Sequence, residues 1–151
     1  MRISAKADYA VRALLEMAKG GQGPVTAERL ALAQDIPRGF LLAILAEMRR
    51  AGLVHSQRGQ AGGWVLARDA RSISVADVIR VVEGPLASVH GQRPEEVAYD
   101  ASAAGLQQVW IAVRASLRDV LENTTIAHLA SGRLPRQVTA RSRDSEAWAP
   151  H

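Results

Sequence analysis

Two short helical patterns joined by a tight turn, with a glycine-rich segment directly after them, constrain the fold of this chain more than any other feature. Thr26 is placed to cap the first helix, and Leu30 and Ala33 are expected to face the core. Pro37 stands at the first position of the second helix, which runs to Ala51. The expected buried stripe of this second helix consists of Leu41, Ile44, Leu45 and Met48. Two such helices, the second carrying arginines, are typical of a helix-turn-helix.

Two β-prone runs on either side of the glycine-rich loop predict a β-hairpin. The runs span residues 53–58 and 64–67, and the loop spans residues 59–63. A hairpin directly after a helix-turn-helix is a wing. The predicted fold class is therefore mainly α with a small β-hairpin wing.

Two further helices are predicted around this motif. Ser4 is a suitable cap for a helix that runs to about Lys19. Ser74 caps a later helix, and Asp77 completes a capping-box-like pair with it before Gly84 closes the element. The winged helix-turn-helix domain is therefore expected to span residues 1–84.

A heptad-like seam marks the second half of the chain. A connecting loop is expected over residues 85–103. A long helix and a short one, capped by Thr124, follow over residues 104–132. The long helix carries apolar residues at spacings of four and three, which predict pairing with a second copy of the chain: Leu106, Trp110, Val113, Leu117 and Val120. Residues 133–151, rich in Arg, Ser, Ala and Pro, are expected to be disordered.

Charge and composition favour a polyanionic partner and exclude several kinds of site. The net charge is +4, and residues 1–83 hold twelve lysines and arginines against eight acids, whereas residues 84–135 hold four against five. The chain has no cysteine, which excludes disulfides, thiolate nucleophiles and thiolate-ligated iron–sulfur or zinc sites. No apolar run approaches the ~20 residues of a membrane span, and no signal peptide is recognisable. We therefore expect a cytoplasmic protein without a membrane partner.

The order of these motifs resembles the Rrf2 family of bacterial transcriptional regulators. The resemblance lies in residues 3–14, 36–41, 44–45, 52–54, 58–67 and 73–79. It implies a winged helix-turn-helix plus a long dimerisation helix. Many members of this family hold an iron–sulfur cluster through cysteines in the loop that corresponds to residues 88–104. This chain has His90 in that loop and no cysteine, although Asp8 matches a ligating acid of some members. We therefore predict no cofactor and no metal, and redox or nitric-oxide sensing is not carried over.

The second helix of the motif is predicted to enter the major groove of DNA, where base edges are distinguishable. Arg38 can donate two hydrogen bonds to a guanine edge, and Gly39 and Phe40 are expected to approach the bases beside it. Leu42 and Ala43 offer only apolar contact, for instance to a thymine methyl.

Phosphate and minor-groove contacts are predicted around this helix. Arg49 and Arg50 at its far end suit phosphates. Arg58 resembles the minor-groove arginine of the family, and Gln60 is expected to join it. Further phosphate candidates lie near helix N-termini and comprise Ser4, Lys6, Tyr9 and Thr26.

Several of these residues have an equally ordinary structural interpretation. Arg49 and Arg50 also suit a solvated helix C-terminus, where cations are favoured. Leu42 and Tyr9 are as compatible with packing inside the fold as with a DNA contact. Asp8 is most simply an acid that favours the first turn of its helix.

The function expected from these features is sequence-specific DNA binding by a homodimer on a pseudo-palindromic operator, as a repressor rather than an enzyme. No nucleophile, base or metal constellation is recognisable. An effector, either a small molecule or a protein, is expected at residues 86–101 and in the groove beside the dimer helix. The alternative is a winged-helix module that docks another protein on Leu42 and Ala46.

Overall fold

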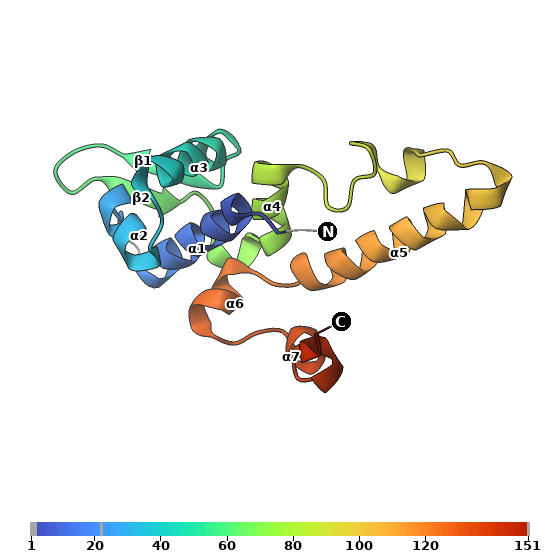
Figure 1. The fold of residues 1–151 in the computed structure, drawn as a ribbon. Helices are drawn as coiled ribbons and strands as arrows, with labels where there is room; N and C mark the ends of the chain where they lie inside the picture. The colour runs from blue at the N-terminus through green and yellow to red at the C-terminus, as the bar shows by residue number, and fades with distance from the viewer. Residues whose placement is uncertain (1–2, 22, 151) are drawn as a thin grey trace.

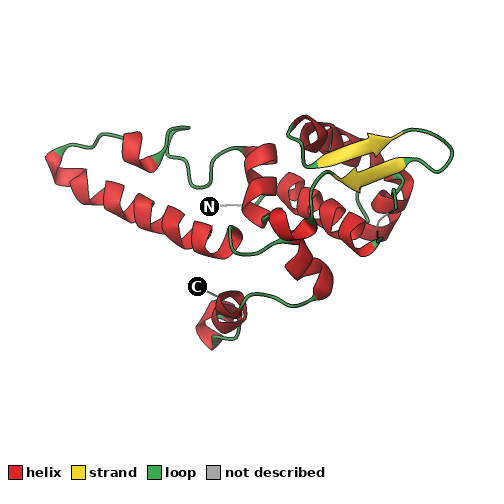
Figure 2. Cartoon of the chain, turned by 180° about the vertical axis from the view of Figure 1, so that it is seen from behind, coloured by secondary structure: helices red, strands yellow, loops and turns green. Residues whose placement is uncertain are grey.

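The computed structural model describes residues 3–21 and 23–150. It shows a mainly helical head, formed by α1 to α4, the hairpin and α6, and one projecting arm, formed by the loop after α4 and by α5 (Figure 1). The hairpin loop and α5 lie at opposite ends of the molecule (Figure 2). The helices and strands are, in chain order, α1 (Ala5–Lys19), α2 (Ala27–Gln34), α3 (Arg38–Arg50), β1 (Val54–Gln57), β2 (Gly63–Leu66), α4 (Val75–Glu83), α5 (Ala104–Leu121), α6 (Ile126–Ser131) and α7 (Arg136–Ser142).

Polar caps fix where the helices of the head begin. The hydroxyl of Ser4 accepts a hydrogen bond from the backbone N–H of Ala7 at 3.1 Å, and that of Thr26 accepts one from Arg29 at 3.2 Å. Ser74 and Asp77 form a complete capping box, as predicted. Pro37 lies one position earlier than expected: it precedes α3, which begins at Arg38.

The core of the head is built by the stripes that helical periodicity predicts, with one exception. Leu41, Ile44, Leu45 and Met48 are all buried, as is Leu30. Ala33 is exposed, so its predicted place in the core was wrong. Successive residues of an α-helix are rotated by about 100°, so Ala33, six residues after buried Ala27, points about 120° away from it. Ile36, after the turn, fills the core instead.

The wing is an antiparallel hairpin rooted against the segment before α2. Val54 pairs with Leu66 at its base, and Gln57 pairs with Gly63 near its loop. Val25 and Trp64 then exchange two backbone hydrogen bonds, of 3.0 and 2.8 Å. The mainly helical fold with a small wing is therefore confirmed, and the hairpin and helix-turn-helix share a rigid backbone link.

The arm leaves the head after α4 and returns to it through α6. Thr124 and Val75, and likewise Ile126 and Ile73, are joined by backbone hydrogen bonds of 2.8 and 2.9 Å. Ile126 is fully buried in the core that α1 helps to form. The predicted cap Thr124 was wrong by one residue, because this backbone pairing forms a bridge between Ser74 and Thr125 and holds Thr125 in the extended conformation of an N-cap. The hydroxyl of Thr124 donates to the carbonyl of Val120, and Thr125 caps α6.

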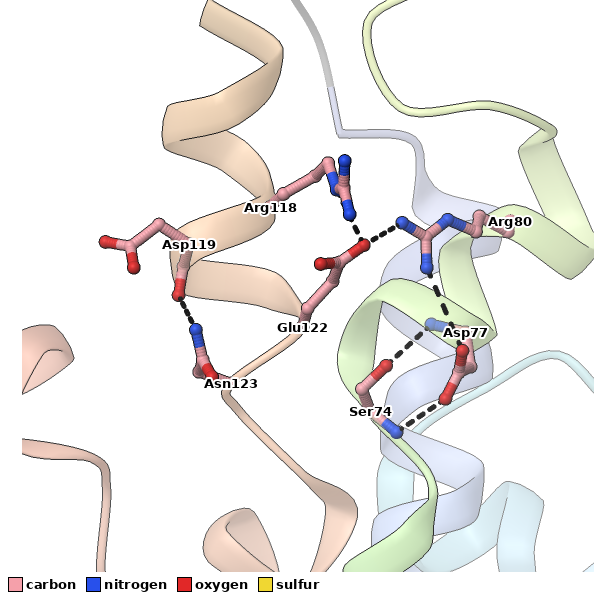
Figure 3. Close-up of polar contacts among 7 residues, drawn as sticks. All are labelled: Ser74, Asp77, Arg80, Arg118, Asp119, Glu122 and Asn123. Carbon is pink, nitrogen blue, oxygen red and sulfur yellow. Dashed lines mark hydrogen bonds and ion pairs between the residues drawn. The ribbon is translucent and has the colours of Figure 1, made fainter.

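A carboxylate shared by two arginines ties α5 to α4. The guanidinium groups of Arg80 and Arg118 both meet the same oxygen of Glu122, the latter at 2.9 Å (Figure 3). The hydrogen bond from Arg118, followed by that from Arg80, lowers the pKa of the Glu122 carboxyl below its usual range. The link keeps its charge at neutral pH.

The segment from residue 133 on contains a helix where disorder was predicted. Pro135 precedes α7. The side-chain amide of Gln137 then donates to the backbone carbonyl of Asp119 at 2.7 Å, and Arg141 pairs with the Asp119 carboxylate at 2.8 Å. These contacts hold α7 against α5, and composition alone does not predict them. Among the residues described, no helix has both the length and the apolar character needed to cross a membrane.

Candidate nucleic-acid interface

The outer face of α3 carries the residues predicted to meet base edges. Arg38, Gly39, Phe40 and Ala43 are exposed, Phe40 to 51%. Leu42 is half-buried and packs against the core. The start of α3 therefore presents one cation, one aromatic ring and a small apolar surface to the outside.

An acid of α2 holds Arg38. The Nη2 and Nε atoms of Arg38 lie 2.7 and 2.9 Å from the same oxygen of Glu28. The pKa of Glu28 is lowered, first by the backbone N–H at the start of α2 and then by Arg38. Sequence reasoning missed Glu28, because its contact with Arg38 appears only when the turn folds α3 against α2.

A second arginine connects α1 to the turn of the motif. Arg12 donates to the backbone carbonyl of Gln34 and to its side-chain oxygen, and its guanidinium lies 5.6 Å from the ring centroid of Tyr9. The Tyr9 ring meets Phe40 edge-on, with centroids 6.0 Å apart. Arg12 also pairs with Asp8 at 3.1 Å. Tyr9 thus packs within the fold, where it supports the first turn of α3.

The phosphate candidates near helix N-termini are partly engaged within the protein. Lys6 forms an ion pair of 2.8 Å with Glu47 of α3. The hydroxyl oxygens of Ser4 and Thr26 accept from backbone N–H groups, which leaves each hydroxyl proton available to a phosphate. A phosphate would therefore have to compete with Glu47 for Lys6, but not with an acid for the hydroxyl groups.

Three arginines at the end of α3 and on the wing have no acidic partner. Within residues 3–21 and 23–150, no ion pair involves Arg49, Arg50 or Arg58. All three are exposed, as is Gln60. Arg49 lies 3.4 Å from the hydroxyl of Ser56 in β1, so the end of α3 adjoins the wing. Cations without an acidic partner are available to neutralise phosphates.

The wing loop is narrow because its glycines allow close backbone approach. A Cβ added at Gly62 would lie 2.4 Å from the carbonyl oxygen of Gln57, which no side chain tolerates. The loop therefore depends on glycine at this position, next to the exposed Arg58 and Gln60.

The predicted dimer seam lies along α5, a helix without buried residues. None of the 18 residues of α5 is buried. Leu106 is 39% exposed, and the other seam residues, Trp110, Val113, Leu117 and Val120, are half-buried. Val109, which the heptad pattern missed, is 51% exposed on the same side of the helix. The seam and Val109 together form a continuous apolar stripe.

The residues near His90 do not fit an iron–sulfur cluster. His90 is exposed, Asp8 is engaged by Arg12, and the chain has no cysteine. Across the described part of the chain, no three His, Cys, Asp or Glu side chains lie close enough to share a metal ion. Iron–sulfur clusters are held by thiolates, so this donor set cannot replace them.

Comparison with known proteins identifies the family. A family model described as "Rrf2: Iron-dependent Transcriptional regulator" matches residues 3–132. Rv1287 of Mycobacterium tuberculosis, whose name places it among HTH-type transcriptional regulators, is 47% identical over 148 residues, covering 97% of this chain and 92% of that protein. The HTH-type transcriptional regulator CymR of Bacillus subtilis is 36% identical over 132 residues, covering 87% and 91%.

Solved structures of similar sequence share the fold of this chain. CymR, described as the global cysteine regulator of B. subtilis, superposes with a TM-score of 0.75 at 35% identity, over 87% of this chain and 98% of that one. IscR of T. potens superposes with a TM-score of 0.72 at 31% identity, over 93% and 96%. These relatives are transcriptional regulators rather than enzymes. The chain belongs to the Rrf2 family of transcriptional regulators.

Proposed function

We propose that this regulator binds a specific operator as a homodimer, with α3 in the major groove and the β1–β2 wing in the minor groove. The observation that carries the proposal is the set of unpaired arginines, Arg49, Arg50 and Arg58, on the surface where α3 adjoins the wing. Cations without acidic partners can neutralise phosphates at no internal cost, and this neutralisation dominates affinity for DNA.

Base recognition is assigned to the start of α3. Arg38 reaches a guanine edge after exchanging Glu28 for the base, and Phe40, Ala43 and the exposed part of Leu42 provide apolar contact to thymine methyl groups. Gly39 lets the helix approach the groove closely.

Phosphate and minor-groove contacts are proposed around the start of α3. Arg58, with Gln60, enters the minor groove, where a narrow A·T-rich segment strengthens the attraction for a guanidinium. Arg49 and Arg50 contact phosphates beside the wing. Further phosphate contacts are assigned to the hydroxyl groups of Ser4, Thr26 and the half-buried Tyr9, and to Lys6, which exchanges Glu47 for a phosphate.

The apolar stripe of α5 is the proposed homodimer interface. It comprises Leu106, Val109, Trp110, Val113, Leu117 and Val120. Its support is the absence of any buried residue in this helix, since an amphipathic helix is stabilised mainly by burial of its apolar face. A two-fold dimer presents two heads to half-sites about one helical turn apart, roughly 34–36 Å, on a pseudo-palindrome.

Repression is the proposed output, through occupation of an operator that overlaps a promoter. A reporter gene behind the regulator's own upstream DNA tests this directly. Expression should rise when the regulator is deleted, and expression that falls instead would mean activation.

Binding to DNA is tested by fluorescence anisotropy with the DNA upstream of the regulator's own gene, at two salt concentrations. Arg58→Ala should weaken specific binding about tenfold and reduce the salt slope by about 1. Arg133→Ala, which removes the same charge from an exposed position after α6, is the matched control and should change neither value.

Equal losses in the two variants would show that net charge, rather than the wing, determines binding. Absence of any specific, salt-dependent binding would instead favour a module that docks a protein on the apolar part of α3 around Leu42 and Ala46.

A further inference from the structure

A cleft of about 430 Å³ opens between the end of α4, the loop after it and the second half of α5. Four arginines from three segments of the chain converge on it, namely Arg80, Arg93, Arg114 and Arg118. Pro85, Leu86 and Pro94 form its apolar wall. No residue of the proposed apolar stripe of α5 is among those that line the cleft.

The side chains that line this cleft carry a net positive charge. Glu95 pairs with Arg114 at 2.5 Å, and Glu122 is shared by Arg80 and Arg118. Within residues 3–21 and 23–150, Arg93 has no ion pair at all. The lining itself holds four arginines and one acid, Glu95. Asp77, 3.9 Å from Arg80, and Glu96, whose carboxylate accepts from the backbone N–H of Arg93 at 3.2 Å, lie outside the lining.

A carboxylate of the protein already occupies part of this cationic surface. The hydrogen bond from Arg114 is the main reason that the pKa of Glu95 is lowered, and the charge of Arg93 contributes in the same direction. The side-chain amide of Gln107 holds the loop in place by donating to the backbone carbonyls of Pro94, Glu95 and Val97. The loop thus holds one anionic group among the arginines, as a small ligand would.

We propose that this cleft binds a small organic anion whose carboxylate or phosphate group contacts Arg93 and Arg114, where it displaces Glu95. Arginine forks suit such groups because they donate two parallel hydrogen bonds to two oxygens. The apolar wall accommodates the carbon skeleton, and the volume lies in the range of small-ligand sites. The inference names the chemistry of an effector and rests on the proposed regulation only for its biological consequence.

The proposal predicts opposite effects for two substitutions in the loop. Arg93→Ala removes a donor to the anion and should weaken binding about tenfold. Glu95→Gln removes the competing carboxylate while keeping the shape of the side chain, and should strengthen binding several-fold. Both side chains are exposed, so neither change opens the core.

Isothermal titration of the full chain, without DNA, measures these effects with two probes, pyrophosphate for the phosphate chemistry and citrate for the carboxylate chemistry. Saturable binding of at least one probe, with one site per chain and the two opposite shifts, is the expected result. The probe that binds more tightly identifies the anionic group. Circular dichroism verifies that each variant is folded.

The DNA-binding surface is the alternative location for an anion and is controlled separately. Arg58→Ala should leave probe affinity unchanged. The proposal is overturned if neither probe binds saturably, if Arg93→Ala and Glu95→Gln have no effect, or if Arg58→Ala alone abolishes binding. Because the titration contains no DNA, its outcome is independent of whether the proposed operator binding is correct.

Discussion

Replacement of Gly63 by alanine should detach the wing from the segment before α2. Gly63 begins β2, and its neighbour Trp64 makes the two backbone hydrogen bonds to Val25. An added Cβ would lie 2.6 Å from the carbonyl oxygen of Val25 and 3.1 Å from the backbone nitrogen of Thr26. Both neighbours are backbone atoms, so no flexible side chain can move aside.

The expected cost follows from this geometry. Cβ atoms in folded proteins do not approach other heavy atoms within about 3.0 Å, so the two segments must separate by about 0.4 Å or more. Loss of the two hydrogen bonds costs about 0.5–1.5 kcal/mol each. Overpacking of this kind costs about 1–3 kcal/mol where the surroundings cannot relax. Gly63→Ala should therefore lower the free energy of unfolding by about 2–6 kcal/mol.

Urea denaturation, followed by circular dichroism, measures the change in free energy, and anisotropy measures DNA binding under conditions where the variant is folded. DNA affinity should fall as well, because the hydrogen bonds to Val25 no longer fix the orientation of the wing. Gly23→Ala is the matched control, since a Cβ there would meet no atom within 4 Å. A free energy of unfolding for Gly63→Ala within about 0.5 kcal/mol of the parent chain would refute the reasoning.

Three other predictions concern the core, the arm and the α4–α5 link. Leu45→Ala should lower the free energy of unfolding by about 2–5 kcal/mol in urea denaturation, whereas Leu32→Ala, at a position 84% exposed, should change it by less than about 0.5 kcal/mol. In sedimentation velocity, Leu117→Glu should shift the chain from dimer to monomer, and Ala115→Glu, on the opposite side of α5, should not; an unchanged dimer in both would contradict the proposed stripe. Because the pKa of Glu122 is lowered in the folded state, its ion pairs stabilise the protein above the usual value of 4.5, and this contribution disappears as the pH falls through the folded-state pKa. Stability measured across that acidic range should therefore depend less on pH in Glu122→Gln, and an unaltered profile would argue against the link.

Local patterns predicted the head well because its helices are determined by their own sequence. The stripe from Leu41 to Met48 repeats at helical spacing, and the caps Ser4, Thr26 and Ser74 act on backbone groups within their own first turn. Such short-range signals are readable without knowledge of the tertiary structure.

The errors arose where contacts distant in sequence decide the local structure. Thr124 looks like a cap, but its pairing with Val75 moves the start of α6 by one residue. The helix after Pro135 depends on Asp119, a residue of α5 that composition cannot bring close.

Partners on the candidate interface were hidden for the same reason. Lys6 meets Glu47, and Arg38 meets Glu28, only once the three helices of the head are packed. Sequence reasoning therefore found the types and order of the surface cations, but could not distinguish those already engaged from those still unpaired.

Because the chain returns to the head through α6, a molecule cleaved in the loop between α4 and α5 should stay in one piece. Ser88, His90, Gly91 and Gln92 lie exposed in the loop that leads to the arm, where a protease can reach the backbone. A single cleavage there would divide the chain into two fragments, yet the second fragment would still hold Ile126 in the core and its backbone pairing beside Ile73. The fragments should therefore migrate together on a native gel and separate only in denaturant. The arm is thus attached to the head twice, by the peptide chain after α4 and by the packing of α6 in the core.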